Sequence, residues 1–126
     1  MRAQGNRTLF LASLSFGTPK TLNAEDARYN VLVAAKAIVA AIGLTVKNWA
    51  WELYEPQGWT LVVFLAESHF IFTAYPEHNL LDVELASCTT VDKDKFYRAL
   101  KEFLPAARHR YPSSALLKTE DGWGIW

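Results

Sequence analysis

The chain has 126 residues, a hydrophobic fraction of 51% and five tryptophans, which is enough apolar material for one domain with its own core. Its 13 basic and 13 acidic residues balance to a net charge of zero, so composition gives no electrostatic reason to expect a nucleic acid or an anionic membrane as a partner. One cysteine cannot form an internal disulfide, which fits a reducing compartment, and we expect a cytoplasmic protein.

The sequence contains no segment that we expect to be a secretory signal or a membrane span. Residues 1–17 lack the long apolar core and small-residue cleavage site of a signal peptide. The most apolar segment, residues 31–46, contains Lys36 and is shorter than the roughly 20 residues that cross a bilayer. We therefore expect this segment to form a helix in the protein core.

The first elements in chain order are predicted to be a strand and a helix. Residues 7–16 are rich in aromatic and aliphatic side chains and precede a turn signal at residues 17–19, which indicates a strand. From there to Gly43, apolar residues recur at helical spacing, which predicts a helix over residues 24–42. Asn23 has the residue type and position of its N-cap.

Four further segments are predicted to be strands. They combine apolar content with alternation or with flanking turn signals, and they cover residues 45–54, 59–66, 69–75 and 80–87. The connections between them are short, which is typical of hairpins. Glu67 and Ser68 lie at the connection between the second and third of these strands.

The second helix is predicted over residues 92–104. Asp92 is a good N-cap, and Val91 and Phe96 have the spacing of a hydrophobic staple across it. Pro105 ends the helix because proline cannot continue it. A last short strand is predicted within residues 114–120. This order predicts an α+β fold, a two-layer α/β sandwich in which one antiparallel sheet carries both helices on one face, as a single domain over residues 1–126.

The triplet Glu67-Ser68-His69 is not expected to be a hydrolase site. Adjacent residues on an extended chain point to opposite faces, so Ser68 and His69 cannot easily share a proton, and no Gly-x-Ser-x-Gly elbow is present. A metal site is not predicted either, because the histidines at positions 69, 78 and 109 lack ligand spacing. From these residues alone, Ser68 and His69 would form a polar kink between two strands.

Four features in register resemble the prokaryotic S-adenosylmethionine decarboxylase family. They are Glu-Ser-His at 67–69, Tyr-Pro-Glu at 75–77, the lone Cys88 twelve residues after Pro76, and the upstream segment 54–66. This segment, YEPQGWTLVVFLA, is similar to the family's aromatic-x-Pro-x-Gly sequence before the strand that leads to the serine. The specific likeness covers about residues 54–88, and chain length and element order fit as well.

The resemblance implies that the chain cuts itself between Glu67 and Ser68, giving fragments 1–67 and 68–126. In the family, the serine hydroxyl attacks the preceding carbonyl, and the resulting ester eliminates and hydrolyses to a pyruvoyl cofactor, here derived from Ser68. That cofactor forms a Schiff base with the substrate amine and accepts the electrons released with CO2, the role of pyridoxal phosphate in other enzymes. A tight bend between two strands suits this attack.

The resemblance also implies roles for three other residues. Cys88 occupies the position of the proton donor to the carbanion that decarboxylation leaves. Tyr54 occupies the position of the aromatic that stacks on the substrate's adenine, and Glu77 that of the glutamate that binds the ribose hydroxyls. Without the resemblance, Tyr54 would be a residue that closes a hairpin, Glu77 a solvated turn residue and Cys88 a small core residue.

The sequence departs from the family at the positions associated with self-cleavage. Thr73 stands where the family has a histidine, and Thr60 stands where it has a serine. Near the N-terminus the family's Gly-x-His is Gly5-Asn6-Arg7. A threonine hydroxyl is not a base near neutral pH, whereas an imidazole is, so we expect any self-cleavage to be slow.

Three functions remain open from the sequence. The first is S-adenosylmethionine decarboxylation for spermidine synthesis, and the second is pyruvoyl-dependent decarboxylation of ornithine or arginine. The third is a non-catalytic, uncleaved homologue that binds a ligand or a catalytic paralogue. Tyr54 and Glu77 favour the adenosyl substrate, whereas Thr73 favours the non-catalytic protein. In each case we expect a homodimer, which the resemblance implies and which would cover apolar strand residues.

Overall fold

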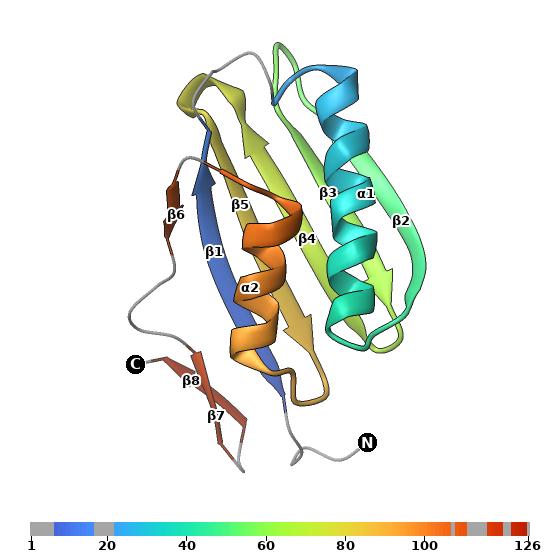
Figure 1. Cartoon of the computed structure of the whole chain (residues 1–126), viewed down its shortest axis with the longest axis vertical. Helices are drawn as coiled ribbons and strands as arrows, with labels where there is room; N and C mark the ends of the chain where they lie inside the picture. Colours follow the sequence, from blue (N-terminus) through green and yellow to red (C-terminus); the bar gives the residue numbers. More distant parts are fainter. Residues whose placement is uncertain (1–6, 17–21, 107, 111–115, 120–121, 126) are drawn as a thin grey trace.

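Six antiparallel strands form one sheet, and both helices cover the same face of it (Figure 1). The structure is a computed structural model that describes residues 7–16, 22–106, 108–110, 116–119 and 122–125. The strands follow the order β2-β3-β4-β5-β1-β6 across the sheet. The two-layer sandwich predicted from the sequence is confirmed. The elements are β1 (Thr8–Ser15), α1 (Glu25–Ala41), β2 (Val46–Leu53), β3 (Trp59–Leu65), β4 (Ser68–Tyr75), the 3-10 turn η2 (Pro76–His78), β5 (Leu80–Ser87), α2 (Lys93–Phe103), β6 (Arg108–Arg110), β7 (Leu116–Thr119) and β8 (Gly122–Ile125).

The predicted helices and strands before residue 106 are present in the structure, and the largest differences lie near the C-terminus. Of the strand predicted within 114–120, residues 116–119 form β7, which pairs with β8 in a separate two-stranded sheet rather than with the main sheet. Residues 114, 115 and 120 lie outside the described residues, as does the predicted turn at 17–19. Strands β6 and β8 are too short to give a clear pattern and were not predicted.

The start of α1 differs from the sequence prediction. Ala24, not Asn23, occupies the N-cap position, and no side chain caps the helix. The Asn23 side chain instead accepts a hydrogen bond from the backbone N–H of Gly58 at 3.1 Å, which ties the β2–β3 connection to the helix entrance. Gly58 needs to be glycine, because its φ is +99° and a Cβ would lie 3.2 Å from the Ala74 carbonyl oxygen.

The predicted signals at the end of α1 and the start of α2 are confirmed. Gly43, with φ +83°, follows the last turn of α1. Asp92 is the N-cap of α2, and its carboxylate accepts the Lys95 backbone N–H at 3.0 Å, a hydrogen bond that lowers the pKa of Asp92. Val91 and Phe96, the two residues of the predicted staple, are both buried in the core.

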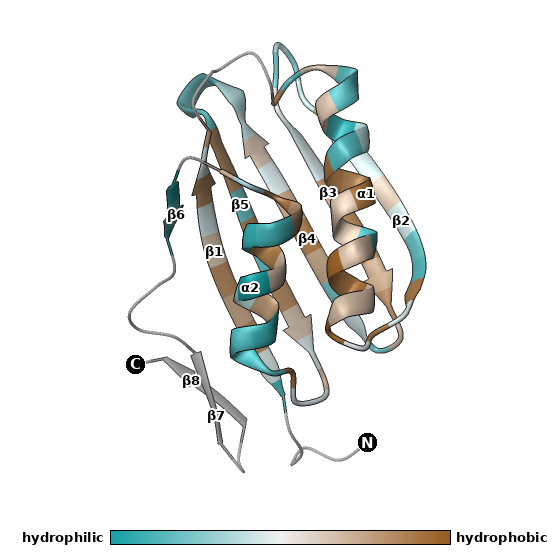
Figure 2. Cartoon of the chain, viewed as in Figure 1, coloured by the Kyte–Doolittle hydropathy of each residue, from teal (hydrophilic) through white to brown (hydrophobic). Residues whose placement is uncertain are grey.

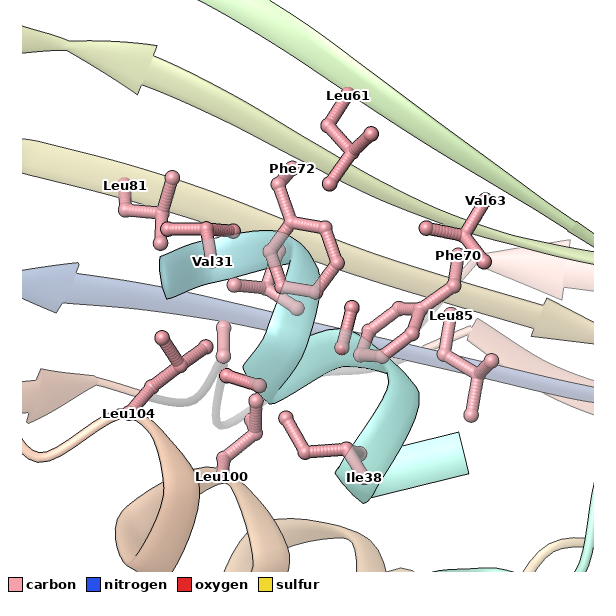
Figure 3. Packing of buried hydrophobic residues seen from close by; sticks show 14 of the residues in the cluster. Val31, Ile38, Leu61, Val63, Phe70, Phe72, Leu81, Leu85, Leu100 and Leu104 are labelled. Atoms are coloured by element: carbon pink, nitrogen blue, oxygen red, sulfur yellow. The ribbon is translucent and has the colours of Figure 1, made fainter. Parts of the chain in front are cut away.

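The core lies between the sheet and the two helices. Alternate residues of the central strands point to this side, so that β3 and β4 bury a run of large apolar side chains against α1 and α2. Figure 3 shows Phe70 and Phe72 from β4 lying among Ile38 of α1 and Leu100 of α2. Figure 2 shows the contrast between the helices: α1 is hydrophobic over the middle of its visible surface, whereas α2 carries hydrophilic bands.

Residues 31–41 of the apolar segment 31–46 form most of α1, a core helix as predicted, whereas 42–45 connect the helix to β2 and Val46 begins that strand. Within the part of the chain that the structure describes, no helix is both long and apolar enough to cross a membrane. Lys36 is accommodated because its ammonium nitrogen lies 4.0 Å from the ring centroid of Trp49 on β2, on the exposed side of the helix.

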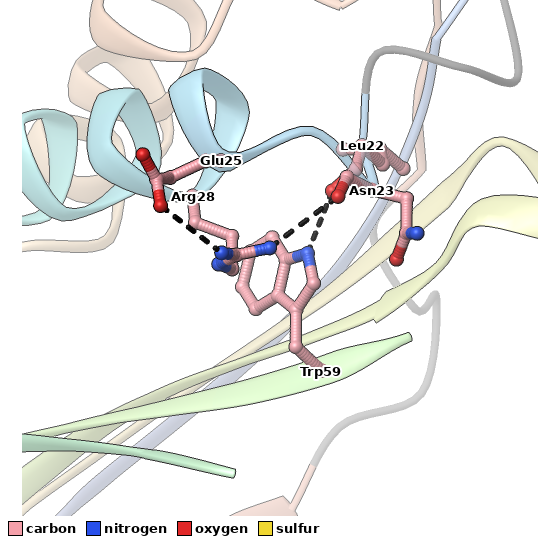
Figure 4. A network of polar contacts seen from close by, with 5 residues as sticks. All are labelled: Leu22, Asn23, Glu25, Arg28 and Trp59. Carbon is pink, nitrogen blue, oxygen red and sulfur yellow. Dashed lines mark hydrogen bonds and ion pairs between the residues drawn. The ribbon is translucent and has the colours of Figure 1, made fainter. Parts of the chain in front are cut away.

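Trp59 joins the sheet to the segment before α1 (Figure 4). Its side chain is fully buried, and its indole Nε1–H donates to the carbonyl oxygen of Leu22 at 2.6 Å. Arg28 donates to the neighbouring carbonyl of Asn23 at 3.3 Å. Because Leu22 is also buried, its carbonyl has little access to water if the indole is removed.

We predict that Trp59→Phe destabilises the fold by about 1–3 kcal/mol, because it leaves the Leu22 carbonyl unsatisfied in addition to removing buried surface. Trp51→Phe is the control, since Trp51 contacts Trp59 edge-on but is only half-buried. Urea unfolding followed by circular dichroism measures both. Equal losses in the two variants would show that the hydrogen bond to Leu22 contributes little.

Candidate active site

The turn between β3 and β4 contains a strained residue directly before Ser68. Leu65 pairs with Ser68, so Ala66 and Glu67 alone make the turn. Glu67 has φ +60°, in the left-handed region that favours glycine, asparagine and aspartate. A side chain there costs roughly 1–2 kcal/mol, so the Glu67–Ser68 linkage is held in a conformation that the rest of the hairpin must stabilise.

The structure brings Glu67, Ser68 and Cys88 together. Ser68 pairs with Ser87 of β5, and its Oγ donates a hydrogen bond to Ser87 Oγ at 3.2 Å. The backbone N–H of Cys88 donates to Ser68 Oγ at 3.3 Å, and the Cys88 thiol lies 3.8 Å from Glu67 Oε1. Cys88 is exposed, so its interpretation as a small core residue is wrong.

His69 lies on the other side of the sheet from the Ser68 side chain. We call the side away from the helices the outer face. His69 Nε2 lies there, 3.5 Å from Glu84 Oε2, while Ser68 shares the helix side with buried Leu65 and Ser87. Ser68 and His69 therefore do not form a nucleophile–base pair. This agrees with the sequence analysis, which placed their side chains on opposite faces.

An open pocket of about 620 Å³ lies at this end of the sheet. Its lining is mostly apolar on the outer face, from Val62, Phe64, Ile71 and Ala86, and includes Ser68, Cys88 and the cationic Arg7. Of the Gly5-Asn6-Arg7 sequence, only Arg7 is among the described residues. Ser68 and Cys88 thus border a space in the size range of small-molecule sites, although the Ser68 side chain itself lies on the helix side of the sheet.

A second group of predicted residues lies at the opposite end of the sheet. The Tyr54 hydroxyl lies 2.9 Å from Thr60 Oγ1, which lies 3.5 Å from Thr73 Oγ1 on the paired strand. Thr60 and Thr73 are on the outer face, between neighbours that point into the core. Glu77, which follows the end of β4 in η2, is exposed.

One chain does not bring the two groups together. Along β4, Thr73 is five residues from Ser68 and Tyr75 is seven, which at about 3.3 Å per residue places them roughly 17 and 23 Å away. Figure 1 shows the β3–β4 turn at one end of the sheet, and the β2–β3 connection with η2 at the other. Thr73 therefore cannot act on Ser68 of its own chain.

Sequence reasoning missed Ser87, Thr89 and Thr8, whose hydroxyls surround Ser68 and its loop. Ser87 and Thr8 are 5% and 7% exposed; the Ser87 and Thr89 hydroxyl oxygens lie 3.0 Å apart, and the Thr8 hydroxyl donates to the Thr89 backbone carbonyl at 2.9 Å. The signal was available: Ser87 occupies an inward position in the alternation of β5, and a polar residue there requires partners.

Comparison with known proteins points to one family. The family model for S-adenosylmethionine decarboxylase matches residues 10–114. The S-adenosylmethionine decarboxylase proenzyme of Aquifex aeolicus (strain VF5) is 45% identical over 47 residues, which are 37% of this chain and a third of that protein's length. The crystal structure of the adenosylmethionine decarboxylase from Aquifex aeolicus VF5 superposes with a TM-score of 0.65 at 23% identity, covering 89% of each chain, a similarity of fold.

Proposed function

Since this chain belongs to the S-adenosylmethionine decarboxylase family, we propose that it is a self-processing, pyruvoyl-dependent decarboxylase of S-adenosylmethionine that serves spermidine synthesis. The observation that carries the proposal is the Ser68 hydroxyl, which is hydrogen-bonded in place directly after a residue in a strained conformation. The exposed free thiol of Cys88 suits a reducing compartment, and we propose a cytoplasmic location.

The first step uses only residues of this chain. Ser68 Oγ bonds to the carbonyl carbon of Glu67 as the C–N bond breaks, and the hydroxyl proton ends on the freed Ser68 amine. The ester then eliminates: Ser68 loses its α-proton, and the main-chain carboxylate of Glu67 leaves as the new C-terminus of fragment 1–67. This gives dehydroalanine at position 68. Tautomerisation and addition of water release ammonia and leave a pyruvoyl group. Breaking the Glu67–Ser68 linkage also releases the strain at Glu67.

The residues around Ser68 fit such a group, because its position borders the pocket and the Cys88 thiol lies in the adjoining loop. Once formed, a pyruvoyl group supplies the electron sink for loss of CO2. Cys88 is then the proton donor to the substrate carbon. The pocket is lined largely by apolar residues, Phe64 and Ile71 among them, which suits a step in which the carboxylate charge of the substrate is lost as CO2.

We propose that a homodimer completes the site. In a two-fold pair of sheets with antiparallel strands and outer faces together, the Ser68 end of one copy meets the Thr73 end of the other. Within one chain, Thr73 and Tyr75 lie roughly 17 and 23 Å from Ser68 along β4, at about 3.3 Å per residue. In the dimer, the equivalent residues of the partner copy lie at the Ser68 end instead. It also covers the apolar side chains of the outer face, of which Phe64 is 44% exposed.

In this dimer, Tyr54 and Glu77 of one copy bind the adenosyl part of a substrate whose carboxylate lies near Cys88 of the other. Tyr54 is 46% exposed, which leaves its ring free to stack on a base. Glu77 is also exposed and can accept hydrogen bonds from two vicinal hydroxyls. Thr60 and Thr73 then lie at the same end of the dimer as Ser68 of the other copy.

We predict slow self-cleavage into fragments 1–67 and 68–126, the second blocked at its new N-terminus. Thr73→His restores a base and should accelerate cleavage, since such groups typically contribute about 10²–10⁴-fold. Ser68→Ala should abolish cleavage. Intact-mass spectrometry over prolonged incubation measures this. A single uncut mass for the wild-type chain and for Thr73→His would leave no electron sink, and the protein would then be an uncleaved binding homologue.

The shared site predicts complementation between inactive variants. Cys88→Ala and Glu77→Ala each remove one contribution, but mixed dimers contain one intact site. Random mixing should recover about a quarter of wild-type activity, because half of the dimers are mixed and one of the two sites in each is intact. Glu77→Ala mixed with Tyr54→Ala is the control, since both changes lie at the same end and no intact site forms. Equal activity in the two mixtures would contradict the shared site.

Substrate choice is tested by binding to Ser68→Ala, which cannot turn over. S-adenosylmethionine should raise its melting temperature by linkage, and Glu77→Ala should reduce that increase. Glu102→Ala, an exposed change on α2, is the control. Stabilisation by ornithine or arginine with none by S-adenosylmethionine would instead identify a basic amino acid decarboxylase.

A further inference from the structure

The Ser68 hydroxyl is part of a linked group of hydroxyls that the proposed reaction has not used. We call Ser68, Ser87, Thr89 and Thr8 the hydroxyl cluster; it joins the starts of β4 and β1 to the loop after β5. Its distances are 3.2 Å from Ser68 Oγ to Ser87 Oγ and 3.0 Å from Ser87 Oγ to Thr89 Oγ1. Ser87 and Thr8 are buried and Ser68 is half-buried, whereas Thr89 is exposed.

The hydrogen-bonding capacity of Ser87 is fully used. Its oxygen accepts the Ser68 hydroxyl at 3.2 Å and the Thr89 backbone N–H at 3.1 Å. Its own proton is then left to donate to Thr89 Oγ1. With two acceptor sites and one donor all engaged, the Ser87 side chain has one defined rotamer, and the direction of the Ser68 O–H bond is defined with it.

Thr8 fixes the loop on which Ser87 depends. Its hydroxyl donates to the Thr89 carbonyl oxygen at 2.9 Å and accepts the Val91 backbone N–H at 3.1 Å. Thr8 also pairs with Ser87 across β1 and β5, so Thr8 contacts both the end of β5 and the loop that follows it. The same loop carries Cys88, whose N–H donates to Ser68 Oγ.

We propose that Ser87 is a positioning residue for self-cleavage, and that the hydroxyl cluster orients Ser68 Oγ for attack on Glu67. Ser68 Oγ donates once, to Ser87, and accepts once, from Cys88 N–H. One lone pair remains, and it is the pair that bonds to the carbonyl carbon of Glu67. This inference rests on the proposed self-cleavage.

The cluster compensates for the missing histidine through geometry and not through basicity. None of its hydroxyls is a base near neutral pH, so it cannot remove the Ser68 proton outright. It instead keeps the nucleophile in one orientation next to the carbonyl, and a positioning effect of this kind is lost when the oxygen rotates freely. Thr73, some 17 Å away at about 3.3 Å per residue, cannot supply that orientation within one chain.

The test compares cleavage of the wild-type chain with Ser87→Ala, Ser87→Thr and Thr90→Ala. Thr90 is an exposed residue of the same loop, so Thr90→Ala is the matched loss of a hydroxyl outside the cluster. Hydroxylamine is added to trap the ester, which it cleaves to a Glu67 hydroxamate and a free Ser68 hydroxyl. Intact mass then separates ester formation from elimination, and melting temperatures are recorded for each chain.

We expect Ser87→Ala to form ester about ten- to hundredfold more slowly than wild type, with Ser87→Thr restoring most of the rate and Thr90→Ala unchanged. Thr89→Val, which keeps the backbone N–H but removes Oγ1, should give an intermediate rate and serves if Ser87→Ala does not fold. Wild-type rates in folded Ser87→Ala, or in Thr89→Val where Ser87→Ala does not fold, would overturn this inference alone. A wild-type chain that gives neither pyruvoyl nor hydroxylamine-sensitive cleavage would overturn the proposed function as well.

Discussion

The pairing of Leu65 with Ser68 across a two-residue turn sets the register on which the arrangement of the site depends. Successive strand residues point to opposite faces, so a slip of one residue would move the apolar residues of β4 to the outer face. In the observed register, Phe70 and Phe72 point into the core, and Ser68 lies beside Ser87 on the same side. The left-handed conformation of Glu67 follows from this turn, so the core and the strained linkage come from one constraint.

This register also explains why the candidate site is divided. An antiparallel hairpin places the residues after β2 and β4 at one end of the sheet and the β3–β4 turn at the other (Figure 1). Tyr54 and Glu77 therefore cannot approach Ser68 in the same chain, whatever their rotamers. The outer face between them is partly apolar and lacks a helix layer, because both helices lie on the other side. A two-fold partner would cover that face and reunite the two halves of the site, which is why the proposed dimer and the proposed chemistry depend on each other.

The sequence predicted features that local residues determine and failed where distant segments compete. Asp92 and Gly43 act within one helical turn, so the boundaries that they set were predicted. Asn23 is a good capping residue, but the N–H of Gly58, thirty-five positions later, uses its side chain. Ser68 and Cys88, which the motif assigns to one site, lie close together in the structure because β4 and β5 are adjacent. The motif alone could not show that Thr73 lies far from both, because spacing along the chain does not give the distance between side chains in the fold.

In the candidate site, Ser68 lies at one end of the sheet. Thr60 and Thr73, at the positions that the family associates with self-cleavage, lie at the other. The hydroxyl cluster, Glu67 and Cys88 belong to one end of one chain, and their hydrogen bonds do not involve position 73. In the proposed self-cleavage, Thr73 in place of the family's histidine would therefore change the supply of a base without disturbing the strained linkage or the hydrogen bonds of Ser68. The Thr60–Thr73 contact is a cross-strand pair of hydroxyls with no charge to desolvate, so the substitution carries little cost to the sheet. If the proposed self-cleavage holds, a chain of this kind would keep the geometry for cleavage and lose mainly speed, which would distinguish it from one whose turn or hydroxyl cluster is disrupted.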